Sequence, residues 1–298
     1  VGANAVDLIC RLPAYPQPSG PLSKLRIQAH RKTPGGQTAT TVSACAALGL
    51  RTAYVGTLGR DADAALMHDA LAGRGVDLRF AMHRDAPTAF AVILVAESQG
   101  ERIVLWDRDP ALTLRPADLP RDLLSRARVV HVDDVDVDAA IAAATIARNA
   151  GAIVTSDIEA AGEQASALIA AVSVPIFAED VPMALTGERS PDAALRALRR
   201  THPGLLCVTL GARGAMLLDG DAIVSQPGFE VDVVDTTGAG DVFRAGFIAA
   251  LLRGEPPASM LRFANAAAAL SCTRPGAIPS VPTRSEVEAF LRACGAGL

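Results

Sequence analysis

The chain has 298 residues, of which 50% are hydrophobic and 20% are charged, and its formal net charge is -4. This length allows one large α/β domain or two smaller domains. The arginines are scattered without basic runs, and no apolar run approaches the roughly 20 residues of a membrane-spanning helix, so neither a nucleic acid nor a membrane is expected as a partner. Five widely spaced cysteines without a CxxC motif are typical of reduced thiols and predict a cytoplasmic protein.

The N-terminal third alternates predicted helices and strands, with two interruptions. "TATTVSACAALG" and "DAALMHDALAGRG" are predicted helices, and "TAYVGTLG" between them is a predicted strand. The first interruption is rich in proline, and the second holds two apolar runs separated by "ESQGE", which is typical of a β-hairpin. We expect residues 10–33 and 87–108 to form one small β sheet, inserted twice into a large α/β domain of residues 1–9, 34–86 and 109–298.

From residue 129 onwards, short apolar runs alternate with helical stretches. The predicted strands are "VVHV", "AIVTS", "PIFA" and "LLCVTL". Alternation at this spacing favours right-handed crossovers and a mainly parallel sheet that helices cover on both faces. The predicted fold class is therefore α/β, with three layers in the order α/β/α.

The stretch "VVDTTGAGDVFRAGF" (233–247) places a glycine turn at the start of an apolar helix. Backbone N–H groups at a helix start point towards one spot, and the helix dipole adds partial positive charge there, so the turn is suited to an anion. Asp241 follows Gly238, Ala239 and Gly240 directly. It could simply cap the helix, or it could take a proton from a hydroxyl group that attacks a phosphate held by the turn.

Four motifs in the same order resemble those of the ribokinase-type (PfkB) sugar kinases. They are "PGGQTATTVSACAALGLRTAYVGTLGRDADA", "VTLGARGAMLL", "DTTGAGDVFRAGFIAAL" and "RFANAAAALSCTRPGAIPSVP". The divergent members of that family, namely ketohexokinase, sulfofructose kinase and 2-keto-3-deoxygluconate kinase, are the most similar in kind. The resemblance implies a ribokinase-like fold with a small β-sheet lid, and transfer of the γ-phosphoryl group of ATP to a hydroxyl of a small sugar or sugar acid. The alternatives are a nucleoside kinase of the same superfamily and a non-catalytic sugar-binding regulator.

The resemblance also implies roles for individual residues. Asp241 is the implied catalytic base, and the N–H groups of Gly238, Ala239 and Gly240 form the implied anion hole. Asp7, placed at the end of the first strand, is expected to accept hydrogen bonds from two sugar hydroxyls. The other implied sugar contacts are Gly35, Gly36, Thr40, Trp106, Arg108 (matching an acid-binding arginine of the ketodeoxygluconate kinases) and Asp133. The implied nucleotide contacts are Thr209, Gly211, Gly214 and Asn265.

Two cation sites follow from the same resemblance. Mg²⁺ is expected with ATP. The family's Asn-x-x-Glu motif is altered to Ala178 and Val181 here, so Glu179 or Asp180 is the candidate to serve the metal instead, through water. A K⁺ site is expected at Asp235, Thr237, Ser271, Arg274, Gly276 and Ser280. Thr40 stands where the family usually has asparagine, so the sugar pocket is expected to differ from that of a standard ribokinase.

Two further expectations concern assembly and the start of the chain. The lid often mediates dimers in the family, so a homodimer through the lid is possible here. Gly2 matches the end of the family's first strand, so we expect either residues upstream of Val1 or a very short first strand.

Overall fold

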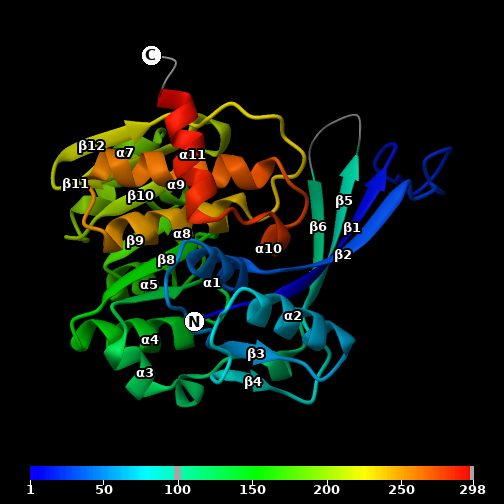
Figure 1. The fold of residues 1–298 in the computed structure, drawn as a ribbon, viewed down its shortest axis with the longest axis horizontal. Helices are drawn as coiled ribbons and strands as arrows, with labels where there is room; N and C mark the ends of the chain where they lie inside the picture. The colour runs from blue at the N-terminus through cyan, green and yellow to red at the C-terminus, as the bar shows by residue number, and fades with distance from the viewer. Residues whose placement is uncertain (97–101, 296–298) are drawn as a thin grey trace.

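The computed structural model describes residues 1–96 and 102–295. Figure 1 shows a layered body with a small sheet that projects from one side. The strands are β1 (Ala5–Leu12), β2 (Ala29–Gly35), β3 (Gly56–Leu58), β4 (Ala81–His83), β5 (Phe90–Ala96), β6 (Arg102–Asp107), β7 (Val129–Val132), β8 (Ile153–Ile158), β9 (Val174–Phe177), β10 (Leu206–Thr209), β11 (Ala215–Asp219) and β12 (Ala222–Gln226). The α-helices are α1 (Gln37–Ala47), α2 (Ala62–Gly73), α3 (Arg121–Arg126), α4 (Val137–Asn149), α5 (Ala165–Ala171), α6 (Val181–Thr186), α7 (Pro191–Arg199), α8 (Ala239–Leu252), α9 (Pro257–Cys272), α10 (Ala277–Ser280) and α11 (Arg284–Gly295).

The central sheet has the strand order β12-β11-β10-β9-β8-β7. Strands β7 to β10 pair in parallel, whereas β11 and β12 form an antiparallel hairpin at one edge. This arrangement confirms the predicted mainly parallel sheet. The carboxyl ends of the parallel strands meet at one edge, which is where open α/β sheets bind their ligands.

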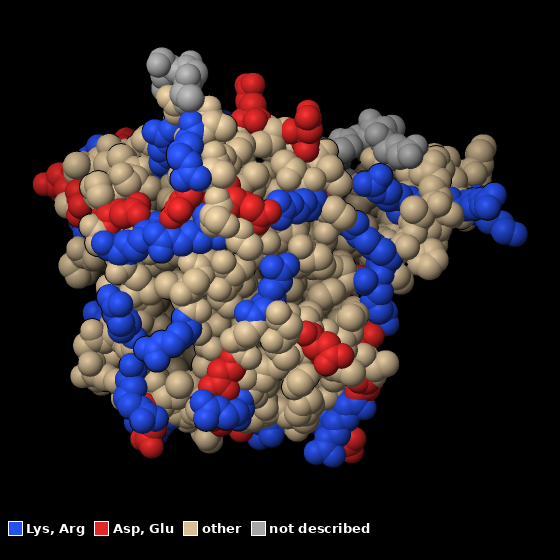
Figure 2. All heavy atoms as spheres, in the orientation of Figure 1, with Lys and Arg blue, Asp and Glu red and all other residues tan. Residues whose placement is uncertain are grey.

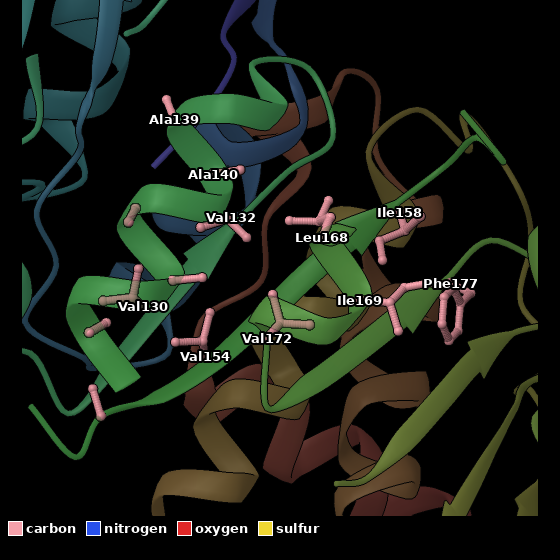
Figure 3. Packing of buried hydrophobic residues seen from close by; sticks show 14 of the residues in the cluster. Val130, Val132, Ala139, Ala140, Val154, Ile158, Leu168, Ile169, Val172 and Phe177 are labelled. Carbon is pink, nitrogen blue, oxygen red and sulfur yellow. The ribbon is translucent and has the colours of Figure 1, made fainter. Parts of the chain in front are cut away.

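Side chains of the central strands alternate between two buried clusters because successive strand residues face opposite sides of a sheet. Val130, Val154 and Phe177 belong to the cluster shown in Figure 3, under α4 and α5. Ile176 and Leu217 belong to the second cluster, with α8 and α9. The sheet is therefore covered on both faces, as the sequence pattern predicts.

The small sheet has the order β2-β1-β5-β6. β5 and β6 are antiparallel, which confirms the predicted hairpin, although its link, residues 97–101, lies outside the described residues. β1 already belongs to this sheet from Ala5, upstream of the expected boundary at residue 10. Asp7 is therefore inside a strand of the small sheet, not at the end of the first strand.

The start of the chain also differs from expectation. β1 begins after Gly2 and has eight residues, so a very short first strand is wrong. The segment before it lies along the central sheet, where the Val1 amino group donates a hydrogen bond to the His131 carbonyl at 2.8 Å. Residues upstream of Val1 stay an expectation. Among the described helices, none has the length and apolar character to cross a bilayer.

Candidate active site

The glycine turn at the start of α8 has the backbone that an anion site needs. Gly238 caps the helix with φ +78°, a left-handed conformation that favours glycine. A Cβ atom at this position would lie 2.8 Å from the Cβ atom of Ala277, so a side chain has no room. The first N–H groups of α8 lack helical partners, and that of Ala239 donates to the Thr236 carbonyl at 3.2 Å. The turn therefore fits the predicted anion hole.

Asp241 lies in the first turn of α8 and is only 8% exposed. Burial raises the pKa of its carboxyl group well above 3.8, the negative charge of Asp157 raises it further, and the positive charge of Arg244 opposes the shift. A carboxylate that is costly to keep charged takes up a proton more readily than an exposed one. Asp241 thus has the property that a general base beside a phosphate site requires.

A buried ion pair lies beside Asp241. Arg244 of α8 pairs with Asp157 at the end of β8, and their side chains are 2% and 0% exposed. Helical side chains point towards the N-terminus, so Arg244 reaches back along α8. Its Nη1 atom lies 2.7 Å from where a Cβ atom of Gly240 would be. A larger residue at position 240 would push this guanidinium group out of its present position.

The sequence predictions missed both members of that pair. Each is a charged residue within an apolar stretch, in "VFRAGFIAAL" and "AIVTSDI". Charged side chains are almost never fully buried unless they are paired, so each was a signal for a partner. The sequence does not say that the two partners are each other.

The predicted sugar-binding residues Asp7 and Gly35 meet beside the glycine turn. A Cβ atom on Gly35 would lie 2.5 Å from Oδ2 of Asp7 and 3.6 Å from the Cβ atom of Ala277. Ala277 is the same residue that contacts Gly238. Gly35, which contacts Asp7, and Gly238 of the anion hole therefore both lie close to the side chain of Ala277. Gly36, with φ +93°, passes so close to the backbone of Asn4 that a side chain would clash there.

Trp106 lies on the same face of the small sheet as Asp7. Asp7 pairs with Ala91 in β5, and Ala91 pairs with Trp106 in β6, so the three side chains form one row. Trp106 is 77% exposed. Its ring is thus available as a wall for a ligand that Asp7 binds.

Two other predicted sugar contacts, Arg108 and Asp133, have structural partners instead, whereas the buried hydroxyl oxygen of Thr40 has no hydrogen-bond partner among the described residues. Thr40 is fully buried, and its methyl group packs 3.2 Å from the Cβ position of Gly238, so it supports the turn. Arg108 donates two hydrogen bonds to Asp136, at 2.9 and 2.7 Å, and one to a backbone carbonyl. Its guanidinium group is therefore occupied by these partners. The acid-binding role predicted for Arg108 has no support in this structure.

Asp133 is 1% exposed and holds the N-terminal segment in place. It accepts hydrogen bonds from the Ala3 N–H at 2.6 Å, from Thr38 Oγ1 at 2.7 Å and from the Val135 N–H at 3.2 Å. Burial raises the pKa of Asp133, and these bonds oppose that shift. A contact between this carboxylate and a sugar is thus not supported.

The predicted nucleotide contacts converge on one loop. Gly211 and Gly214, with φ +57° and +93°, frame a short 3-10 turn after β10. A Cβ atom on Gly214 would lie 2.1 Å from the carbonyl oxygen of Gln226. Asn265 donates to that same carbonyl and to the Pro227 carbonyl, both at 3.0 Å. Asn265 therefore fixes the loop, while Thr209 donates to the Phe177 carbonyl at 3.2 Å.

Glu179, the predicted Mg²⁺ ligand, forms an ion pair with Arg213 of the 3-10 turn. Over residues 1–96 and 102–295, no group of three or more His, Cys, Asp or Glu side chains is placed to hold a metal ion. Mg²⁺ usually takes only one or two protein carboxylates and completes its shell with phosphate oxygens and water. The chain thus provides no closed metal cage at Glu179.

The predicted K⁺ site does not fit the contacts of Asp235. Its Oδ1 atom accepts from the N–H of Thr237 at 3.0 Å and from the Thr237 hydroxyl at 2.7 Å. Its Oδ2 atom accepts from the Gly276 N–H at 2.8 Å and from the guanidinium group of Arg31. A carboxylate offers about four lone-pair sites, so these four donors saturate it.

The remaining side chains assigned to that cation are also engaged. Ser271 and Ser280 donate to helical carbonyls at 2.7 and 2.8 Å, and Arg274 pairs with Glu286. The side chains assigned to K⁺ thus have other partners, and the one carboxylate among them is bound to Arg31 of the small sheet. Arg31 was not singled out from the sequence, where it lies in a polar stretch without a recognisable motif.

One hollow of the surface lies apart from all of these residues. It measures about 420 Å³ and is lined mainly by charged residues of α9 and α11, such as Arg262, Arg292 and Glu288. Figure 2 shows basic and acidic side chains side by side on the face that carries these helices. The candidate site consists of the residues that come together around Ala277. This hollow is not part of it.

Comparison with known proteins gives consistent relatives along the whole chain. Residues 4–284 match the model of the pfkB family carbohydrate kinases. Fructokinase-1 of Oryza sativa subsp. japonica is 33% identical over 287 residues, which cover 86% of this chain and 87% of that protein. An ATP-dependent ribose-1-phosphate kinase of Halopiger xanaduensis is 31% identical over 286 residues, covering 96% and 94%.

Solved structures agree with these relatives. The ribokinase of Arabidopsis thaliana, solved with ribose and ATP, superposes with a TM-score of 0.82 at 27% identity and covers 97% of this chain and 96% of that one. The ribokinase of Thermotoga maritima has a TM-score of 0.84 at 25% identity, with coverage of 98% and 97%. The ribokinase-like α/β fold predicted from the motifs is thereby confirmed.

Proposed function

Because the chain belongs to the pfkB family of carbohydrate kinases, we propose that it transfers the γ-phosphoryl group of ATP to a hydroxyl group of a small neutral sugar. The observation that carries the proposal is the position of Asp241, a buried carboxyl group with a raised pKa directly behind the glycine turn. A base in this position accepts the proton of the sugar hydroxyl as that oxygen attacks the phosphorus atom.

The turn supplies the second part of the mechanism. The backbone N–H groups of Gly238, Ala239 and Gly240 donate to the equatorial oxygens of the phosphoryl group in transit. Negative charge that develops there also meets the positive end of the α8 dipole. The pair of Arg244 and Asp157 holds the underside of this turn, so the donors do not have to reorganise during the reaction.

The proposed sugar is neutral because two arginines near the site, Arg108 and Arg31, already have carboxylate partners. Arg108 is held by Asp136, and Arg31 is held by Asp235. Asp7 is proposed to accept hydrogen bonds from two neighbouring hydroxyls, with Trp106 as an apolar wall on the same face. Fructokinases among the relatives and the ribokinase solved with ribose both favour a ketohexose or a pentose as the first compounds to test.

ATP would lie along Thr209, Gly211 and Gly214, beside the loop that Asn265 fixes. Mg²⁺ would arrive with the nucleotide, and it neutralises phosphate charge when it is bound. Glu179 and Asp180 both lie between the two altered motif positions, and Glu179 can reach the ion only by leaving Arg213. The proposed cofactors do not include K⁺, since Asp235 has no free acceptor site.

The small sheet is proposed to act as a lid over the sugar and as a contact with a second copy of the chain. Phe90 and Leu105 are 41% and 55% exposed, and they lie on the face opposite to Asp7. Exposed apolar side chains grouped on one face commonly mark an interface. Size-exclusion chromatography of Leu105→Glu tests the dimer, which this charge is expected to dissociate.

A screen of ADP release tests the proposed function. Ketohexoses, aldopentoses, sugar acids and nucleosides are each added to the protein with ATP and Mg²⁺. The proposal predicts release that depends on a neutral ketohexose or pentose. Preference for a nucleoside would favour the nucleoside kinase alternative, and no stimulation by any acceptor would favour the non-catalytic sugar-binding alternative.

A further inference from the structure

We infer that Arg31 takes the place of a monovalent cation at the anion-hole turn, so that this kinase needs no K⁺ and its small sheet is tied to its catalytic turn. The inference rests on the proposed function for its catalytic consequence. Its physical content, a built-in positive charge at Asp235, stands on the hydrogen bonds of that carboxylate alone.

The position of Asp235 explains why its partner matters. It lies just ahead of Thr237 and the glycine turn, and its Oδ1 atom accepts both the N–H and the hydroxyl hydrogen of Thr237. The carboxylate therefore fixes the residue that leads into Gly238. A positive charge on the other side of the carboxylate keeps it ionised and in place.

The positive charge comes from a distant part of the chain. Arg31 belongs to β2 of the small sheet, yet its guanidinium group reaches Oδ2 of Asp235. The side chain of Asp235 is 14% exposed, so the contact is partly shielded from solvent. Burial alone would raise the pKa of Asp235, but the donors from Gly276 and Thr237 and the charge of Arg31 outweigh it and lower the pKa.

A second contact joins the same two regions. Gly276 donates its N–H to Asp235, and a Cβ atom on Gly276 would lie 2.8 Å from the hydroxyl oxygen of Thr33, also in β2. Strand β2 thus reaches this region at two places: Arg31 contacts Asp235 ahead of α8, and Thr33 lies beside Gly276 ahead of α10. Movement of β2 would pull on the carboxylate that positions the glycine turn.

The arrangement has two consequences. First, a soluble cation has no saturable site at Asp235 while Arg31 is bound there. Second, the docking of β2 and the order of the glycine turn stabilise each other, because free-energy coupling between two sites is reciprocal. The small sheet would therefore do more than cover the sugar: its docking would complete the anion hole.

The test compares Arg31→Met with Lys32→Met, a matched control on the same strand whose ammonium group pairs with Asp63 at 2.7 Å. Melting temperature and kcat are measured in KCl and in tetramethylammonium chloride at constant ionic strength. For the parent protein and Lys32→Met, we expect no difference between the two salts. For Arg31→Met, we expect kcat to fall by about 10- to 100-fold in tetramethylammonium, as for a misplaced catalytic group.

K⁺ should then restore much of that kcat and raise the melting temperature of Arg31→Met by about 2 °C, because an ion that binds the folded state stabilises it. Arg31→Lys, which keeps the charge, should stay independent of K⁺. Strong activation of the parent by K⁺ would overturn the inference, as would Arg31→Met that melts and turns over alike in both salts. The melting measurements need no turnover, so failure of the proposed function and failure of this inference give different results.

Discussion

Asp235 and Asp241 flank the same glycine turn, but their surroundings shift their pKa values in opposite directions. Asp235 accepts four hydrogen bonds, which outweigh its partial burial and lower its pKa. Asp241 is more deeply buried and faces a second carboxyl group, Asp157, which raises its pKa. Because of its hydrogen-bond donors, Asp235 is a fixed anion that shapes the turn. Because of its burial, Asp241 is a carboxyl group that can exchange a proton.

The largest expected effect follows from removing the proton acceptor. Asp241→Asn keeps the size of the side chain, and no side chain makes a cap hydrogen bond at the start of α8, so binding of ATP and the melting temperature should be kept. Loss of a general base typically lowers the rate ~10²–10⁴-fold, and we expect this loss in kcat. Asp232→Asn, an exposed aspartate nearby, is the control and should leave kcat unchanged.

Next in size is the buried pair that supports Asp241. Arg244→Met leaves Asp157 buried without its partner, which typically costs about 3–5 kcal/mol of unfolding free energy. We expect the lower end, because burial raises the pKa of Asp157 and a proton can neutralise it. Urea unfolding measures the loss.

Two further variants control that measurement. The double variant Asp157→Leu, Arg244→Met should recover most of the stability, since buried pairs are often replaceable by apolar residues. Arg196→Met removes an exposed partner of Asp192 and should cost less than ~0.5 kcal/mol. A double variant as unstable as Arg244→Met alone would contradict this account of the pair.

A smaller effect is expected at Asp235. Asp235→Asn loses its charge and two of its four acceptor sites. At neutral pH we expect the free energy of unfolding to fall by about 1–2 kcal/mol, after allowance for the half-exposed Arg31. Because folding lowers the pKa of Asp235, its contribution is present above pH 3.8 and disappears as the pH falls below that value. The melting temperatures of parent and variant should therefore converge at low pH. A gap that stays constant from pH 7 to 3 would show that the charge of Asp235 is irrelevant.

The smallest expected effect is a shift in the pH profile. Asp241 must be ionised to act as a base, so kcat/KM should fall as the pH drops through its raised pKa. Burial raises that pKa most, the charges of Asp157 and Glu159 raise it further, and the charge of Arg244 lowers it. Asp157→Asn removes a negative neighbour and should move the acidic limb to lower pH. An acidic limb that is unchanged, or that moves to higher pH, would show that Asp157 does not raise the pKa of Asp241.

Much of this site could be predicted because its parts are contiguous in the chain. The glycine turn and Asp241 occupy one short motif, and the fold places that motif at a helix start as the residue pattern requires. The alternation of apolar runs likewise predicted the parallel sheet, since each buried strand needs a covering helix. Asp7 and Gly35 also came together, although Asp7 lies in the small sheet.

What could not be predicted depends on pairing across the chain. Arg31 reaches Asp235 over more than two hundred positions, and Arg244 reaches Asp157 from another element. A sequence shows that a buried charge needs a partner, but packing decides which one. The same reason explains why Arg108 and Asp133, both credible sugar ligands by position, are engaged by Asp136 and by Thr38 instead.

Transfer of label from ATP tests the central claim most directly. The protein is incubated with ATP labelled at the γ-phosphate, Mg²⁺ and the best neutral sugar from the screen, and the label in sugar phosphate is compared with that in free phosphate. We predict that nearly all label passes to the sugar, and that Asp241→Asn lowers this transfer by at least ~100-fold. Label found only in free phosphate, or transfer by Asp241→Asn within about threefold of the parent, would contradict the assignment of Asp241 as the base of a sugar kinase.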